Sequence, residues 1–160
     1  MRTRTAWALG ALLALTAVGV GAADTEPAAA PAAVRDRLSG ARALIADNKW
    51  AAAIEELRRV GDGGSADWNN LMGYSHRKAR VPDYAAAERF YNEALRIDPQ
   101  HRGALEYSGE LYLMTGDLAK AEARLAALDK ACAVPCAEQA TLKKAVANFK
   151  ANGNRYVPAP

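Results

Sequence analysis

Two cysteines are the first residues of this chain whose type and spacing suggest chemistry. Cys132 and Cys136 lie in the stretch DKACAVPCAEQ, with a proline just before the second cysteine. Three residues separate them, whereas thioredoxin-like redox motifs and haem attachment motifs have two. A zinc site would need two further ligands, and no other cysteine or any histidine lies nearby. The spacing alone leaves a structural disulfide, a reactive pair and a metal-binding pair open.

The other titratable residues form no recognisable catalytic group. His76 and His101 are isolated, and no metalloprotease, serine-hydrolase, phosphate-loop or dinucleotide-binding motif occurs. We expect His76 to have a structural role rather than to bind a ligand. Glu106 and Glu110 are one helical turn apart, an arrangement that most often marks a solvated helix face. The sequence therefore predicts no catalytic residue, no metal and no cofactor, and a protein that is not an enzyme.

The N-terminal segment predicts export. Arg2 and Arg4 precede an apolar run and several small residues, which is the layout of a secretory signal peptide over residues 1–23. The apolar run is shorter than the roughly 20 residues that cross a bilayer. We expect cleavage before Asp24, with a retained N-terminal anchor as the alternative, and then a flexible Ala/Pro linker over residues 24–33.

Removal of the signal peptide changes the charge of the chain. The chain carries 21 basic and 18 acidic residues, and loss of two arginines lowers its formal charge from +3 to +1. No polycationic surface then remains for nucleic acid or anionic lipid. No later segment is apolar enough to span a membrane, so we expect no membrane insertion after cleavage. The sequence predicts a periplasmic or secreted protein, from a Gram-negative bacterium, that binds no nucleic acid.

Export also bears on the two cysteines. Disulfides persist in oxidising compartments. Two cysteines four positions apart in a proline-containing turn can come within bridging distance. We therefore expect an intramolecular structural disulfide between Cys132 and Cys136. An exchangeable pair, and metal-binding or intermolecular use of the cysteines, remain as alternatives.

A self-similarity at a shift of 34 residues organises most of the chain. Four columns of similar residues recur, spaced three, four and three positions apart within each copy, so that they share one face of an α-helix. The columns are Trp50, Tyr84 and Leu118; Ala53, Ala87 and Ala121; Leu57, Tyr91 and Leu125; and Val60, Ala94 and Leu128. An alanine follows each bulky first residue by one turn, which lets two helix backbones approach closely.

Each of these helices is preceded by another with a small residue in its middle, at Ala41, Gly73 or Gly109. Asp83 and Asp117 are suitable N-caps for the second helices. The sequence therefore predicts an all-α fold of three helix-turn-helix hairpins and a C-terminal capping helix. The predicted ranges are 34–65, 66–101 and 102–135 for the hairpins, 137–151 for the capping helix, 34–152 for the whole domain and 153–160 for a flexible tail.

The pattern resembles the tetratricopeptide repeat (TPR), whose 34-residue units are antiparallel helix pairs stacked into an α-solenoid. The middle copy, GYSHRKARVPDYAAAERFYNEALRIDP, is the strongest match, and the third copy, GALEYSGELYLMTGDLAKAEARLAAL, matches as well. A stack of such hairpins leaves an apolar face open at its last member. Leu142, Val146 and Phe149 fall on one side of the predicted capping helix and would cover that face.

The resemblance implies a concave groove lined by the first helix of each hairpin. The implied groove residues are Arg35, Leu38 and Arg42; Asn70, Tyr74, Arg77 and Lys78; and Glu106, Tyr107, Glu110 and Leu113. The first two sets are basic or hydrogen-bonding and the third is acidic. An extended peptide with one negative and one positive end would fit this gradient.

Three functions are compatible with these features. The leading hypothesis is an exported, non-catalytic module that binds a peptide or protein partner in the groove. A thiol-disulfide or metal-handling protein that uses Cys132 and Cys136 is the second. A structural subunit of an envelope complex is the third.

Overall fold

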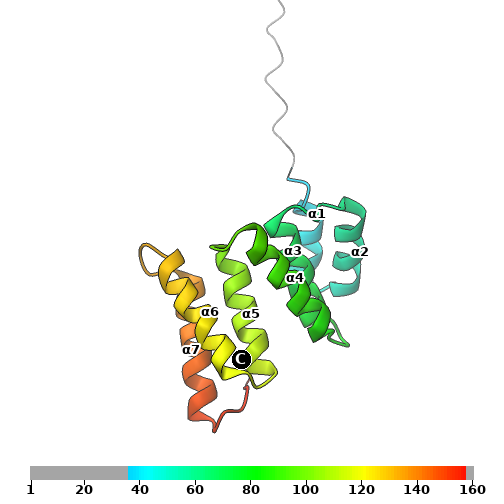
Figure 1. Ribbon diagram of the computed structural model, residues 1–160. Helices are drawn as coiled ribbons and strands as arrows, with labels where there is room; N and C mark the ends of the chain where they lie inside the picture. Colours follow the sequence, from blue (N-terminus) through cyan, green and yellow to red (C-terminus); the bar gives the residue numbers. More distant parts are fainter. Residues whose placement is uncertain (1–35, 158–160) are drawn as a thin grey trace, which may run out of the picture. The chain divides into compact units, whose positions relative to one another are not determined.

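The computed structural model describes residues 36–157, which form seven α-helices and no β-strand within that range (Figure 1). The helices are α1 Ser39–Ala46, α2 Trp50–Val60, α3 Ala66–Lys78, α4 Tyr84–Ile97, α5 Arg102–Met114, α6 Leu118–Ala131 and α7 Ala137–Ala151. The predicted all-α fold of three hairpins and one further helix is thereby confirmed. The predicted signal peptide and linker lie outside the described residues, as does Arg35.

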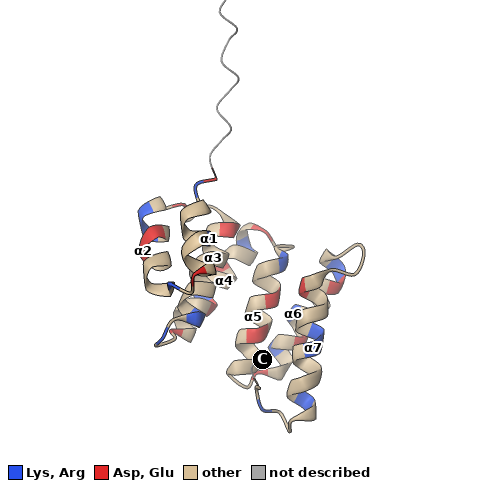
Figure 2. Ribbon diagram, turned by 180° about the vertical axis from the view of Figure 1, so that it is seen from behind, with Lys and Arg blue, Asp and Glu red and all other residues tan. Residues whose placement is uncertain are grey.

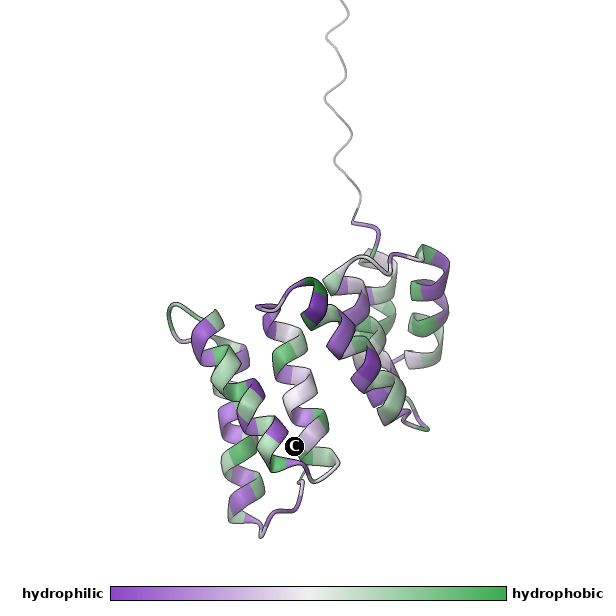
Figure 3. Cartoon of the chain, in the orientation of Figure 1, coloured by the Kyte–Doolittle hydropathy of each residue, from purple (hydrophilic) through white to green (hydrophobic). Residues whose placement is uncertain are grey.

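Neighbouring helices in the sequence are also neighbours in space. Within the hairpins, α1 packs on α2, α3 on α4 and α5 on α6, and successive hairpins meet through α2 with α3 and α4 with α5. The last helix, α7, packs on both α5 and α6. Charged residues are distributed along the helices, with acidic residues on α5 and basic residues on α7 (Figure 2). Apolar and polar segments alternate along each helix, as expected for helices that bury one face (Figure 3).

The residues that repeat at 34 positions lie where the hairpins close. Trp50, Tyr84 and Leu118 are the first residues of α2, α4 and α6. The alanines one turn later have no solvent exposure. Gly73 is required by a similarly close approach, because an added Cβ would lie 2.7 Å from Cε1 of the fully buried Tyr91 ring. The positions that repeat in the sequence are therefore the positions at which helices contact each other.

The ends of the helices follow the predicted capping residues. Asp83 accepts a hydrogen bond from the backbone N–H of Ala86 at 2.8 Å, and Asp117 does the same for Lys120 at 3.0 Å. Gly116 has φ of +83°, a left-handed conformation that ends α5 and that glycine adopts without strain. The predicted N-caps of the second helices are thus confirmed.

The C-terminal helix buries the apolar face predicted for it. Leu142, Val146 and Phe149 join a core cluster formed with residues of α5 and α6. The segment after α7 differs from the prediction of a flexible tail, because Tyr156 is half-buried and packs against the same cluster. Residues after 157 lie outside the described part of the chain. The chain thus returns to the face of α5 after its last helix.

Candidate functional site

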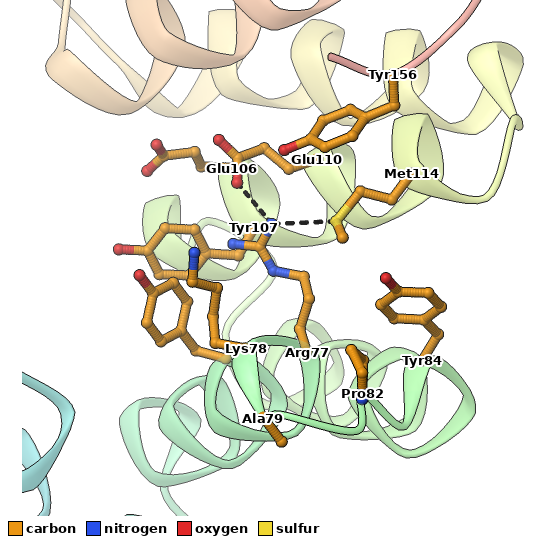
Figure 4. Close-up of a pocket in the computed structure, with 11 residues that line it drawn as sticks. Arg77, Lys78, Ala79, Pro82, Tyr84, Glu106, Tyr107, Glu110, Met114 and Tyr156 are labelled. Atoms are coloured by element: carbon orange, nitrogen blue, oxygen red, sulfur yellow. Dashed lines mark hydrogen bonds and ion pairs between the residues drawn. The ribbon is translucent and has the colours of Figure 1, made fainter. Parts of the chain in front are cut away.

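A pocket of about 450 Å³ lies where α3 faces α5 (Figure 4). Six of the predicted partner-binding residues line it, namely Tyr74, Arg77, Lys78, Glu106, Tyr107 and Glu110. They converge because α3 and α5 are the first helices of successive hairpins and present equivalent positions to the same side. Tyr84, Met114 and Tyr156 also line the pocket, together with Ala79 and Pro82.

Two tyrosine rings in tilted contact form the aromatic part of the pocket. The ring centroids of Tyr74 and Tyr107 are 4.6 Å apart at an angle of 42°. Burial raises the pKa of Tyr107 to about 12, and burial also raises the pKa of Tyr74 above its ordinary value. Both side chains are therefore neutral phenols at physiological pH. They offer rigid, half-buried surface together with a polar hydroxyl, which is a combination favoured at binding sites.

Arg77 is held at the base of the pocket. Its side chain is 4% exposed, and its Nη1 donates a hydrogen bond to Oε2 of Glu110 at 2.7 Å. The guanidinium carbon also lies 5.3 Å from the ring centroid of Tyr74 and 5.5 Å from that of Tyr107. Figure 4 shows Arg77 reaching from α3 toward Glu110 on α5. This buried pair joins two hairpins, so these two predicted partner-binding charges neutralise each other.

Glu106 has a different environment from Glu110. Its exposure is 9%, and it makes no hydrogen bond or ion pair with any residue between 36 and 157. Burial and the nearby carboxylates of Glu110 and Glu138 raise the pKa of Glu106 to about 7, although Arg77 acts in the opposite direction. The expectation of a solvated glutamate pair is therefore wrong for this residue. Glu106 is a buried carboxyl group that titrates near neutral pH and borders a pocket.

Three other predicted groove residues are buried between helices and do not line the pocket. Leu38 and Leu113 were expected to line the groove, but they are 6% and 1% exposed and belong to two core clusters. Their apolar side chains are buried because the first helix of each hairpin packs on both sides. Asn70 is 7% exposed, and its amide lies at the contact between α3 and Gly103 at the start of α5.

Arg42 lies apart from the pocket in a surface network. Its side chain forms ion pairs with Asp36 at 3.4 Å and with Asp67 at 3.3 Å. Asp67 also contacts Nε2 of His101 at 3.0 Å, while Nδ1 of that histidine accepts the backbone N–H of Ala104. His101 therefore caps α5 through Nδ1 and contacts Asp67 through Nε2. The predicted basic end of the groove is thus largely neutralised by these carboxylates.

Sequence reasoning missed the contribution of Tyr156 to this site. Its ring lies beside Glu110 and Met114 in Figure 4. The sequence around it, NRYVPAP, has no helical periodicity and no capping signal. Only the aromatic character of Tyr156 in a polar tail could have drawn attention to it. His76 behaves as expected, since its ring stacks on Phe90 with centroids 5.5 Å apart.

The two cysteines join the third hairpin to the last helix. Cys132 follows α6 directly and Cys136 is the N-cap residue of α7. The structure pairs them as a disulfide, with a Cα–Cα distance of 6.0 Å that is typical of such bridges. Cys132 packs against the core cluster of α5, α6 and α7. Within residues 36–157 no cluster of three or more potential metal ligands occurs.

Loss of this disulfide is expected to have a modest effect on stability. The closed loop is short, so the chain-entropy model gives a loss of at most ~2 kcal/mol in the free energy of unfolding. Urea unfolding of the wild type and of a Cys132→Ser/Cys136→Ser variant measures the difference. A measured reduction potential near those of exchange catalysts, rather than below about −300 mV, would instead favour a redox role.

Comparison with known proteins agrees with this architecture. A family model described as a tetratricopeptide repeat matches residues 83–148, from the N-cap of α4 into α7. No curated protein matches the sequence. Among residues 36–157, no helix combines the length and the apolar character that crossing a membrane requires. The match places residues 83–148 in the tetratricopeptide repeat family, whose members generally mediate protein–protein interactions, and the three helix pairs are consistent with a solenoid of such repeats.

Proposed function

We propose that this chain is an exported, non-catalytic module that binds an extended segment of a protein partner in the pocket between α3 and α5. One observation carries the proposal: six groove residues inferred from the repeat converge on a single pocket. TPR domains in general bind protein partners, which supports this assignment. The pocket combines rigid aromatic surface with charged groups, which is the composition expected of a site that anchors a few side chains.

Export to the periplasm of a Gram-negative bacterium, or secretion, is part of the proposal. The N-terminal signal-peptide pattern supports it. The cysteine pair at disulfide distance supports it independently, because disulfides persist mainly outside reducing compartments. The non-catalytic assignment rests on the sequence, which carries no recognised nucleophile–base or metal-ligand motif.

Photo-crosslinking in the native envelope tests the binding site. A photoreactive phenylalanine derivative at Lys78, on the pocket rim, is expected to crosslink to a partner, whereas the same group at the exposed Arg89 of α4 is not. Tyr74→Ala is expected to weaken this crosslinking at least about tenfold, because aromatic anchors of this kind dominate binding energy. Circular dichroism of the variant verifies that it is folded. Equal crosslinking from both positions, or unchanged capture by folded Tyr74→Ala, would contradict the proposal.

A further inference from the structure

Glu106 is a buried acid without a partner at the binding pocket. Its carboxyl group lines the pocket on α5, together with the tilted rings of Tyr74 and Tyr107. Glu106 is 9% exposed as a residue, and no described residue donates a hydrogen bond to it or pairs with it, so that only solvent in the open pocket reaches its oxygens. Burial of an ionised carboxyl group without compensation costs free energy. A cation from outside the chain would compensate this charge more fully than the solvent in the pocket does.

Neither of the two cations that line the pocket is paired with Glu106. Arg77 is committed to Glu110, with Nη1 2.7 Å from Oε2. Lys78 lines the same pocket but is exposed on α3 and forms no ion pair with any carboxylate between residues 36 and 157. Glu110 and Glu138 add negative potential around Glu106. The balance of charge on the α5 side of the pocket is negative.

The aromatic rings beside Glu106 also suit a positively charged group. The faces of tyrosine rings attract ammonium and guanidinium ions. Tyr74 and Tyr107 already hold the guanidinium of Arg77 within 5.5 Å of both ring centroids. The alkyl stem of a lysine or arginine side chain would in addition bury apolar surface against these rings. A volume of about 450 Å³ lies within the range of sites that enclose small groups.

We propose that this pocket receives a lysine or arginine side chain from an extended segment of the partner, and that Glu106 is the carboxylate that pairs with it. This inference rests on the proposed function and specifies the chemistry of the partner. Charge complementarity selects the occupant, because a negative or apolar side chain would leave Glu106 buried and unpaired. The remaining residues of the segment would lie across α3 and α5, toward the exposed Lys78.

Pairing with a cation should depend on pH. A buried acid with a pKa of about 7 is partly protonated at neutral pH and fully ionised about two units higher. A bound cation stabilises only the ionised form, and it therefore displaces the proton from Glu106. Arg77, Glu110, Glu138 and Lys78 face the same region, but none of them is required to change its protonation. Binding of a cationic segment is thus expected to be tighter at pH 8 than at pH 5.5.

A matched set of synthetic peptides tests the inference on the full folded chain. The probe is a blocked alanine–serine nonapeptide with lysine at its centre, and the controls carry norleucine, which has no charge, or glutamate there. Amide resonances of Glu106 and Tyr107 are followed by NMR during titration at pH 8. The lysine peptide is expected to shift them at a concentration at least about tenfold lower than the norleucine peptide, since a charge-assisted hydrogen bond is worth about this ratio.

Two variants separate the role of Glu106 from general charge effects. Glu106→Gln is expected to remove the preference for lysine, so that the lysine and norleucine peptides bind alike. Glu122→Gln changes an exposed glutamate on α6 and is expected to keep the full preference. Peptide binding that favours norleucine or glutamate, or a lysine preference that survives Glu106→Gln, would overturn this inference and leave the binding site in place. Failure of every peptide to shift the pocket resonances would contradict the proposed site itself.

Discussion

Glu106→Gln is expected to raise the free energy of unfolding at pH 8 by about 2 kcal/mol, and to leave it nearly unchanged at pH 4. The carboxyl group has a pKa of about 7 in the folded chain against an ordinary value of 4.5. Such a shift corresponds to about 3 kcal/mol at most, and solvent in the open pocket reduces this figure. Glutamine has the same shape without the charge, so it removes the cost of ionising a buried acid.

The sign of this effect follows from which state binds more protons. Below pH 4.5 both the folded and the unfolded chain carry a protonated Glu106, and the residue contributes no pH dependence. Between pH 4.5 and about 7 the unfolded chain releases its proton first, so the folded state progressively loses stability. Above this range the loss is complete and constant. Stability of the wild type, as far as Glu106 determines it, therefore falls as the pH rises from 4.5 through 7.

Urea unfolding at pH 4, 6 and 8 measures the prediction. The difference between Glu106→Gln and the wild type should grow across this series and correspond to roughly 8 °C in melting temperature at pH 8. The exposed control Glu122→Gln should show no such trend. An identical increment at all three pH values would show that the side-chain shape, and not the ionisation of Glu106, is responsible.

Glu110→Gln is expected to lower the free energy of unfolding by about 3 kcal/mol, because it leaves the guanidinium of Arg77 buried without its carboxylate. The side chain of Arg77 is 4% exposed and that of Glu110 is 20% exposed. Arg77 and Glu110 are 33 positions apart in the sequence, and their ion pair connects α3 with α5. Its loss should therefore weaken the contact between the second and third hairpins as well as the base of the pocket.

A double-mutant cycle distinguishes pairing from packing. The double variant Arg77→Met/Glu110→Leu removes both charges and is expected to recover to within about 1 kcal/mol of the wild type, since apolar replacements of buried ion pairs are often neutral. As a control, Glu93→Gln breaks the exposed pair with Arg96 and should cost less than about 1 kcal/mol. Denaturant unfolding of the wild type, the single variants Arg77→Met and Glu110→Leu, and the double variant gives the coupling, and Glu110→Gln and Glu93→Gln are measured beside them. A double variant as unstable as Glu110→Gln would refute the role of the unpaired guanidinium.

Glu106 and Glu110 lie one turn apart on α5 and are expected to have opposite effects on stability. Glu110 forms an ion pair with Arg77 and stabilises the folded chain. Glu106 has no such partner, and its ionisation lowers the stability of the folded chain. A stabilising substitution at a pocket residue is typical of a position that is retained for binding rather than for folding. The free energy of unfolding and the preference for a lysine peptide are therefore two independent measures of the Glu106 carboxyl group.

Much of the fold was predictable because its determinants are local. The first residues of α2, α4 and α6 are Trp50, Tyr84 and Leu118, the positions at which the 34-residue repeat begins. Asp83 and Asp117 cap their helices through backbone groups three residues away. Helical periodicity and capping involve neighbours within a few positions, so the sequence alone specifies them. Six of the predicted groove residues on α3 and α5 line one pocket, because the same local spacing places them on facing sides of these helices.

The charges of the site were not predictable in the same way. Whether Arg77 meets a partner or Glu110 depends on how α3 and α5 are rotated against each other, which helical spacing does not determine. The burial of Leu38 and Leu113 depends equally on which further helices cover them. Tyr156 reaches the pocket because the chain turns back after α7, and no local pattern indicates that return.

The sequence by itself determined the all-α fold, the three helix pairs and the N-caps Asp83 and Asp117, and it indicated six residues of α3 and α5 that line one pocket. Helical periodicity and hydrogen bonds between residues a few positions apart determine these features. The tertiary structure alone decided that Arg77 is paired by Glu110 while Glu106 is buried without a partner. The physical reason is that burial and charge pairing depend on side chains from different helices, whose approach is set only when the hairpins pack together.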